Sequence, residues 1–152
     1  MSDNIIIRKA NESDLEEILA LINAPEADNG TLMELRDANT IYQTILNDSN
    51  YFQIIASSEQ GIVGIVTLVI IVQMTHEGST TALISDLIVS EKLLSQKLQA
   101  TVTIDLLQYA SNLAHEYGCY KSMIQNDYQS ELTEGACEAL GFEKSNHSFL
   151  TF

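Results

Sequence analysis

The chain has 152 residues, of which 45% are apolar and 18% charged, and 21 acidic residues against seven basic ones give a formal charge of −14. This length is typical of one domain that buries about two-thirds of its unfolded surface, so we expect residues 1–152 to form a single domain. The apolar content excludes a disordered chain, and one proline and seven glycines leave no room for a linker.

The distribution of charged and apolar residues disfavours several classes of partner. The seven cations stand singly or in pairs, so no basic stripe could neutralise the phosphates of a nucleic acid. The longest apolar stretch, Ile62 to Val72, is far shorter than the roughly 20 residues of a membrane span. The polar, acidic amino terminus predicts a cytoplasmic protein without a secretion signal. The two cysteines fit reduced thiols of the cytoplasm. Because the three histidines are scattered and the cysteines are few, the sequence predicts no metal site.

The amino-terminal third predicts a strand and two helices. The β-branched run Ile5 to Ile7 predicts the strand. Ser13 to Glu16 has the form of a capping box that opens a helix, which ends near Pro25. A second capping pattern, at Thr31 and Glu34, predicts another amphipathic helix.

The remaining sequence predicts a sheet with two further helices. Tyr51 to Ala56 and Ile62 to Val72 flank a turn-like segment and predict an antiparallel hairpin, and Thr80 to Val89 predicts the next strand. After them we expect a long helix that ends at Gly118, a strand from Lys121 to Gln125, a helix from about Ser130 to Leu140 and a final extended segment from Glu143 to Phe152. The order β-α-α-β-β-β-α-β-α-β predicts an α+β fold, an α/β sandwich of helices around a mixed, mostly antiparallel sheet.

Several segments carry a resemblance to a known family. Ala82 to Val89 is similar to a fourth strand that often reads Ile-Glu-Asp-Val-Val-Val, and Gly61 to Gly64 looks like the usual start of the third strand. Leu140 to Phe142 looks like the Gly-Phe that closes the last helix. With Ile5 to Ala10 and Tyr117 to Lys121, these segments resemble the GCN5-related N-acetyltransferase (GNAT) family over essentially the whole chain. Within that family they resemble the aminoalkylphosphonate and glucosamine-phosphate acetyltransferases.

The resemblance implies transfer of an acetyl group from acetyl-coenzyme A to the primary amine of a small molecule by direct attack. In the family, backbone groups of the fourth strand hold the pantetheine arm and the thioester carbonyl, which implies this role for Leu87, Ile88 and Val89. Asp86 matches the second acid of the family's Glu-Asp pair, so it is expected to bind the amine or accept its proton. Ser85 replaces the first acid, which excludes a paired-carboxylate mechanism. The alternative for Asp86 is a satisfied polar residue at a strand end or bulge.

The family's pyrophosphate loop, Gln/Arg-x-x-Gly-x-Gly/Ala, is not reproduced. An ungapped alignment places Lys97 at the first glycine and Gln99 at the second, and Ala100 offers a small side chain one residue late. Lys97 could supply a charge to the phosphates, or Lys97 and Gln99 could simply be exposed residues of the first helical turn. The candidate pyrophosphate-binding residues are Lys97, Leu98, Gln99 and Ala100.

The family's general acid, a tyrosine on the last helix, falls at Cys137. The candidates for that role are the Cys137 thiol, the Tyr128 phenol or water, although either side chain could instead serve packing. His76, in the loop before the fourth strand, lies where relatives bind substrate but is expected to be a surface residue, as is His147.

Three readings follow. The first is an N-acetyltransferase, for which the acidic surface favours a cationic amine over a phosphonate or a sugar phosphate. The second is a pseudoenzyme of the same fold with a decayed coenzyme site. The third is an interaction module whose acidic face docks a basic partner, with the splayed strands of the fold used to form a homodimer. We take the acetyltransferase as the leading hypothesis, because backbone contacts to pantetheine do not depend on side-chain identity.

Overall fold

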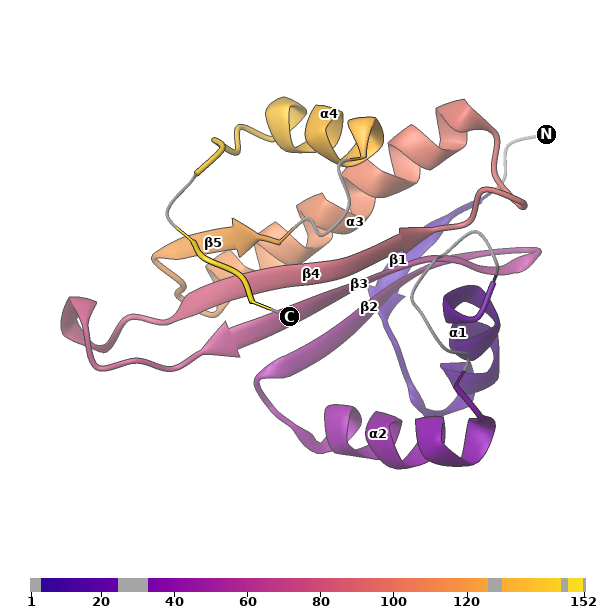
Figure 1. Cartoon of the computed structure of the whole chain (residues 1–152), viewed down its shortest axis with the longest axis horizontal. Coiled ribbons are helices and arrows are strands. Elements are labelled where there is room, and N and C mark those ends of the chain that lie inside the picture. Colours follow the sequence, from indigo (N-terminus) through magenta and orange to yellow (C-terminus); the bar gives the residue numbers. More distant parts are fainter. Residues whose placement is uncertain (1–3, 25–32, 126–129, 146–147, 152) are drawn as a thin grey trace.

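A five-stranded sheet forms the centre of the protein (Figure 1). The computed structural model describes residues 4–24, 33–125, 130–145 and 148–151. The strands lie in the order β1-β2-β3-β4-β5, and all neighbours are antiparallel except β4 and β5, which are parallel. The strands are β1 (Ile6–Lys9), β2 (Tyr51–Ser58), β3 (Gly61–Ile71), β4 (Thr81–Val89) and β5 (Lys121–Ile124).

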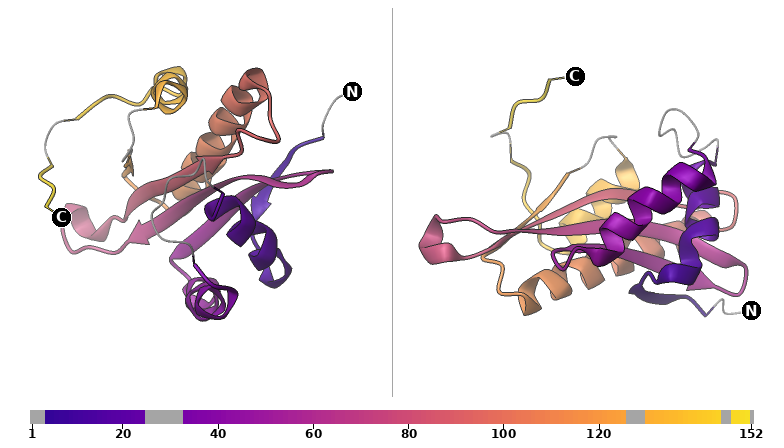
Figure 2. Two further views of the ribbon diagram at one scale, coloured as in Figure 1. Left: turned by 45° about the vertical axis from the view of Figure 1, so that its right-hand side comes forward. Right: turned by 90° about the horizontal axis from the view of Figure 1, so that it is seen from below.

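Helices cover both faces of this sheet (Figure 2). One face carries α1 (Leu15–Ile22) and α2 (Leu35–Asn47), and the other carries α3 (Gln96–Glu116) and α4 (Glu131–Ala139). This arrangement confirms the predicted α+β sandwich around a mostly antiparallel sheet. Among the described residues, no helix is both long enough and apolar enough to cross a membrane.

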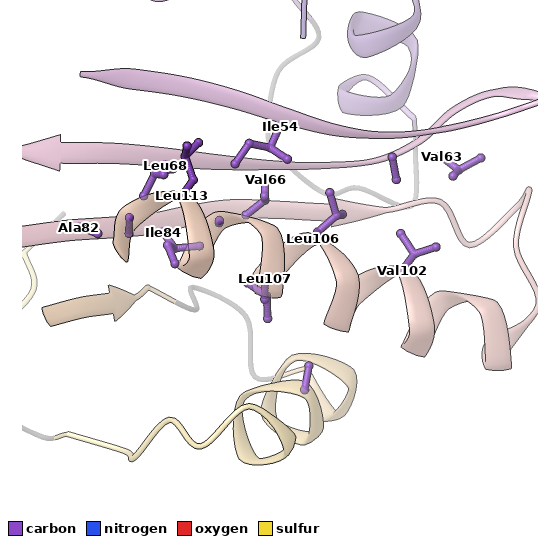
Figure 3. Packing of buried hydrophobic residues seen from close by; sticks show 14 of the residues in the cluster. Ile54, Val63, Val66, Leu68, Ala82, Ile84, Val102, Leu106, Leu107 and Leu113 are labelled. Atoms are coloured by element: carbon purple, nitrogen blue, oxygen red, sulfur yellow. The ribbon is translucent and has the colours of Figure 1, made fainter. Parts of the chain in front are cut away.

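The apolar core has two layers because alternate residues of a strand point to opposite faces of the sheet. Ile54, Val66 and Ile84 belong to the layer beneath α3, which Figure 3 shows from close by. Ile55 and Ile65 belong to the layer beneath α1 and α2. Burial on both faces explains why the sequence of β3 is an almost continuous apolar run rather than an alternating one.

Gly64 allows α3 to approach the sheet closely. A Cβ atom at this position would lie 2.9 Å from Cδ1 of Leu106 and 3.1 Å from Cγ1 of Val102. Leu106 is fully buried and Val102 is 1% exposed, so neither side chain has free space into which it could retreat. The glycine therefore sets the spacing between β3 and the helix that follows β4.

An ion pair between Arg8 and Asp14 joins β1 to the segment before α1, where the sequence also predicts a capping box. The predicted capping box at Ser13 to Glu16 is wrong, because the box is formed two residues earlier by Asn11 and Asp14. Asp14 accepts from the backbone N–H of Asn11 at 2.8 Å and binds Arg8 through two hydrogen bonds of 2.7 and 2.9 Å. The Arg8 guanidinium lowers the pKa of Asp14 below its ordinary value, so the carboxylate remains charged although it is buried.

Three further predictions differ from the structure or lie outside it. The predicted final strand from Glu143 to Phe152 is not formed in the described part of that segment, where Phe149 is fully exposed and has no apolar surface to cover. Glu34 is the N-cap of α2 but makes no capping hydrogen bond through its side chain. Pro25 and Thr31 lie outside the described residues.

The close approach at Gly64 predicts a stability difference between two matched substitutions. Gly64→Ala should lower the free energy of unfolding by about 1–3 kcal/mol, because a methyl group there overpacks the core. Gly135→Ala, on α4, places its Cβ where no atom lies within 4 Å, and should raise stability by about 0.5–1 kcal/mol. Urea unfolding followed by circular dichroism measures both variants, and equal effects would contradict the packing described for α3.

Candidate functional site

A β-bulge interrupts β4 at Asp86. Thr67 of β3 pairs with Ser85 and Ile65 pairs with Ile88, so Asp86 and Leu87 together lie opposite the single residue Val66. Asp86 has a φ of 53°, in the left-handed region that few residues other than glycine, asparagine and aspartate adopt. A bulge bends its strand and increases the local twist. The expected alternative for Asp86, a polar residue at a bulge, is therefore correct about its place in the backbone.

Beyond the bulge, one edge of β4 has no strand partner among the described residues. The pairing with β5 ends at Ile84 and Ile124, and its last hydrogen bond joins the Gln125 N–H to the Ile84 carbonyl at 2.8 Å. β4 itself continues to Val89, past the end of β5 (Figure 1). β5 thus ends opposite Ile84, and β4 continues beyond it through the bulge to Val89.

The backbone groups at this open edge can be assigned from the ladder with β3. The Ser90 N–H donates to the Val63 carbonyl at 2.8 Å, so Ser90 directs its backbone groups toward β3. Successive residues of a strand direct these groups to opposite sides, so those of Val89 and Leu87 point away from β3 toward the gap. Ile88 lies between them and directs its backbone groups to β3, while its side chain packs under α1.

The start of α3 lies at the end of the same strand. Ser95 caps this helix: its hydroxyl accepts from the Leu98 N–H at 3.2 Å and its carbonyl accepts from the Gln99 N–H at 2.8 Å. The first N–H groups of a helix have no acceptor within the helix, so those of Gln96 and Lys97 remain available to an anion. Lys97 is exposed at this end of the helix.

The remaining pyrophosphate candidates have different surroundings. Gln99 is only 9% exposed and its side-chain amide donates to the Leu94 carbonyl at 2.9 Å, so the idea that Gln99 is an exposed first-turn residue is wrong. It stabilises the turn before α3 instead of occupying a phosphate cradle. Leu98 packs against the main core, and Ala100 is half-buried.

Comparison with solved structures finds chains of the same fold, although no family model and no curated protein matches the chain. A transcriptional regulator from Bacillus halodurans C-125 matches with a TM-score of 0.81 at 22% identity, over 98% of this chain and 99% of that one. Glucosamine-6-phosphate N-acetyltransferase from Arabidopsis thaliana matches at 0.78 and 15% identity, over 99% of both chains. An aminoglycoside N-acetyltransferase in complex with CoA matches at 0.72 and 15% identity, over 100% of this chain and 96% of that one.

The chain has the GNAT fold. Sequence identities of 15–22% show a shared fold but not a shared function. The chemistry of this chain therefore has to be argued from its own residues.

The other candidates of the sequence occupy different parts of this GNAT fold. Cys137 packs against the main core, and burial, with the charge of Glu134, raises the pKa of its thiol, which is therefore protonated at neutral pH. His76 stacks on Tyr120 with ring centroids 4.4 Å apart in a short 3-10 turn before β4. Tyr128 and His147 lie outside the described residues. In the part of the chain that the structure describes, no group of three His, Cys, Asp or Glu side chains could hold a metal ion.

Sequence reasoning missed a set of polar side chains beside the bulge. Gln53 donates through its amide to the Thr67 hydroxyl at 3.0 Å, and Thr67 pairs with Ser85, the residue before Asp86. A signal was present in the sequence, because Gln53 and Thr67 interrupt two apolar strands that are otherwise rich in isoleucine and valine. Polar residues in such strands are expected to be hydrogen-bonded to one another or to serve a site.

The left-handed conformation of Asp86 predicts how substitutions affect stability independently of any reaction. Asp86→Asn should leave the free energy of unfolding almost unchanged, because asparagine tolerates this conformation. Asp86→Ala should lower it by about 1 kcal/mol, since alanine is strained at positive φ. Urea denaturation of the two variants gives the comparison, and an alanine variant as stable as the asparagine variant would show that β4 lacks the bulge.

Proposed function

We propose that the protein is an N-acetyltransferase that moves the acetyl group of acetyl-CoA to the primary amine of a small molecule. The observation that carries this proposal is the open edge of β4, where the backbone groups of Leu87 and Val89 face a gap that no described strand fills. Buried backbone N–H and C=O groups require partners. An extended chain with amide groups, such as the pantetheine arm of CoA, can supply them in the manner of an added strand.

The reaction requires few catalytic side chains. The amine nitrogen attacks the thioester carbon, the carbon–sulfur bond breaks, and the ammonium R-NH3+ with acetyl-S-CoA gives the acetamide, the free thiol and one proton. Negative charge develops on the thioester oxygen in the transition state, and a fixed backbone N–H is well suited to stabilise it. The N–H groups of Leu87 and Val89, held by the ladder on the other side of β4, are proposed for this task.

Asp86 is proposed to orient the acceptor. Its side chain is exposed next to the open edge, so a carboxylate is presented beside the proposed thioester position. A carboxylate forms a charge-assisted hydrogen bond with an ammonium group and can accept a proton from it. With Ser85 as its neighbour, Asp86 acts alone, and we assign no general acid to Cys137, which packs in the core.

The beginning of α3 is proposed to hold the phosphates of CoA. The N–H groups of Gln96 and Lys97 and the positive end of the helix dipole favour an anion there. The lysine that replaces the first glycine of the family pattern adds a full positive charge to these partial charges. The exposed position of Lys97 fits this role, because its flexible side chain can turn away from the backbone amides.

Calorimetric titration of acetyl-CoA at low salt tests the coenzyme site. The expected result is saturable one-to-one binding, weakened about three- to tenfold by Lys97→Ala through the loss of one charge near the phosphates, with a smaller effect at high salt. Lys121→Ala is the matched control, because Lys121 begins β5 and lies over the ring of Tyr120.

Absence of binding by the wild-type protein at millimolar acetyl-CoA would contradict the proposal and favour the pseudoenzyme. Equal losses of affinity in both lysine variants would instead contradict the assignment of the phosphates to α3.

A further inference from the structure

The sheet face beneath α1 and α2 is sealed at one end and accessible at the other. Ile55 and Ile65 lie at the sealed end and are 0% and 2% exposed. Four residues further along the same face, Tyr51 of β2 and Val69 of β3 are only half-buried, as is Leu83 of β4, which pairs with Val69. All of these residues point to the same face of the sheet, because alternate residues of a strand share a face. The two ends of that face therefore differ in how well their side chains are buried. This strip of the sheet beside the bulge therefore keeps partly exposed surface.

A row of polar side chains lies between the buried and the half-buried region of this face. Gln53, Thr67 and Ser85 occupy consecutive strands at one level of the sheet. The Gln53 amide donates to the Thr67 hydroxyl at 3.0 Å and to the Val66 carbonyl at 3.3 Å. Val66 is the residue opposite the bulge. This row fixes the floor of the strip next to Asp86.

Tyr51 lies on the same face of the sheet, two residues before Gln53 on β2. Burial, together with the negative charge of Asp86, raises the pKa of its phenol above the ordinary value. The phenol is consequently protonated at neutral pH, and the strand register places Tyr51 on the same face of the sheet as Ser85, the residue before Asp86. A phenol oxygen accepts a hydrogen bond from an ammonium group while the phenol proton is donated elsewhere.

The charges around this strip have one sign. Asp48, at the end of α2, adds a second negative charge near Tyr51. Arg36 lies at the other end of α2, about 16 Å from Asn47 at the helical rise of 1.5 Å per residue. Four cations have other partners: Arg8 binds Asp14, Lys144 binds Glu134, and Lys9 and Lys121 lie over aromatic rings. Lys92 lies before α3 and Lys97 in its first turn, and among the described residues no salt bridge joins a lysine or arginine to Asp48 or Asp86.

We propose that Tyr51 binds the acceptor together with Asp86, and that the acceptor is a cationic primary amine without a phosphate or another anionic group. This inference rests on the proposed N-acetyltransferase function. The Tyr51 oxygen and the Asp86 carboxylate would share the N–H groups of the ammonium, and the apolar floor at Val69 and Leu83 would contact the carbon skeleton. A phosphorylated amine would bring a negative charge to a strip that offers it no cation.

The experiment measures thiol release at saturating acetyl-CoA with two matched pairs of acceptors, glucosamine with glucosamine 6-phosphate and ethanolamine with phosphoethanolamine. We expect kcat/KM for the unphosphorylated member of a pair to be at least tenfold higher. Tyr51→Phe should raise KM for the amine about tenfold with little change in kcat, as expected for a lost hydrogen bond to a charged group. Asp86→Asn with Tyr51→Phe should be less harmful than the product of the single effects, because the two groups bind one ammonium.

Two control variants separate this role from general effects. Tyr109→Phe removes a phenol on α3, on the opposite face of the sheet, and Asp105→Asn removes an exposed charge from the same helix. Both should leave KM unchanged, and the Kd for acetyl-CoA should be the same in Tyr51→Phe as in the wild type. Thiol release that Tyr51→Phe leaves unaltered, or a preference for the phosphorylated amines, would overturn the inference while the acetyltransferase function stands. No thiol release with either pair would overturn both.

Discussion

The site depends on one extra residue in β4. All four residues of β5 pair with Thr81 to Ile84, and β4 continues beyond them through the bulge with one edge in the ladder and one edge that no described strand covers. The extra residue changes which backbone groups of the following residues face this edge, so the bulge determines that Leu87 and Val89 present theirs there. The bulge also turns Asp86 out of the alternating pattern, which presents its carboxylate beside the open edge.

The rest of the fold fixes the bulge and compensates for its strain. A non-glycine residue at positive φ costs of order 1 kcal/mol, and it persists only where the surrounding structure determines the backbone. On one face, the contact of Gly64 with Leu106 and Val102 holds α3 against β3, which also positions the start of α3 after β4. On the other face, Gln53 bonds the carbonyl of Val66 opposite the bulge. Packing on one side and hydrogen bonds on the other thus define the same short stretch of β4.

Periodicity and turn residues were enough to predict the elements, but several functional details depend on tertiary contacts. The hairpin of β2 and β3, the strand β5 and the helices α2 and α3 follow from patterns within their own segments. The capping box was misplaced because Asp14 is held by Arg8, a partner on another element. Gln99 appeared exposed by its place in the first helical turn, yet it turns inward to the Leu94 carbonyl. Tyr51 was missed because a tyrosine at the start of a strand is indistinguishable in sequence from a packing residue, and only the register of three strands brings it near Asp86.

Amide hydrogen exchange of the wild-type protein with and without CoA tests the central claim most directly. If the open edge of β4 receives the pantetheine arm, CoA should slow exchange at Leu87 and Val89, whose N–H groups face the gap, and at the first residues of α3. The N–H groups of Ile88 and Ser90, which face β3 in the ladder, should change much less. Protection of β1 or α2 with no change at Leu87 and Val89 would contradict the account, because the ligand would then bind away from the open edge of β4.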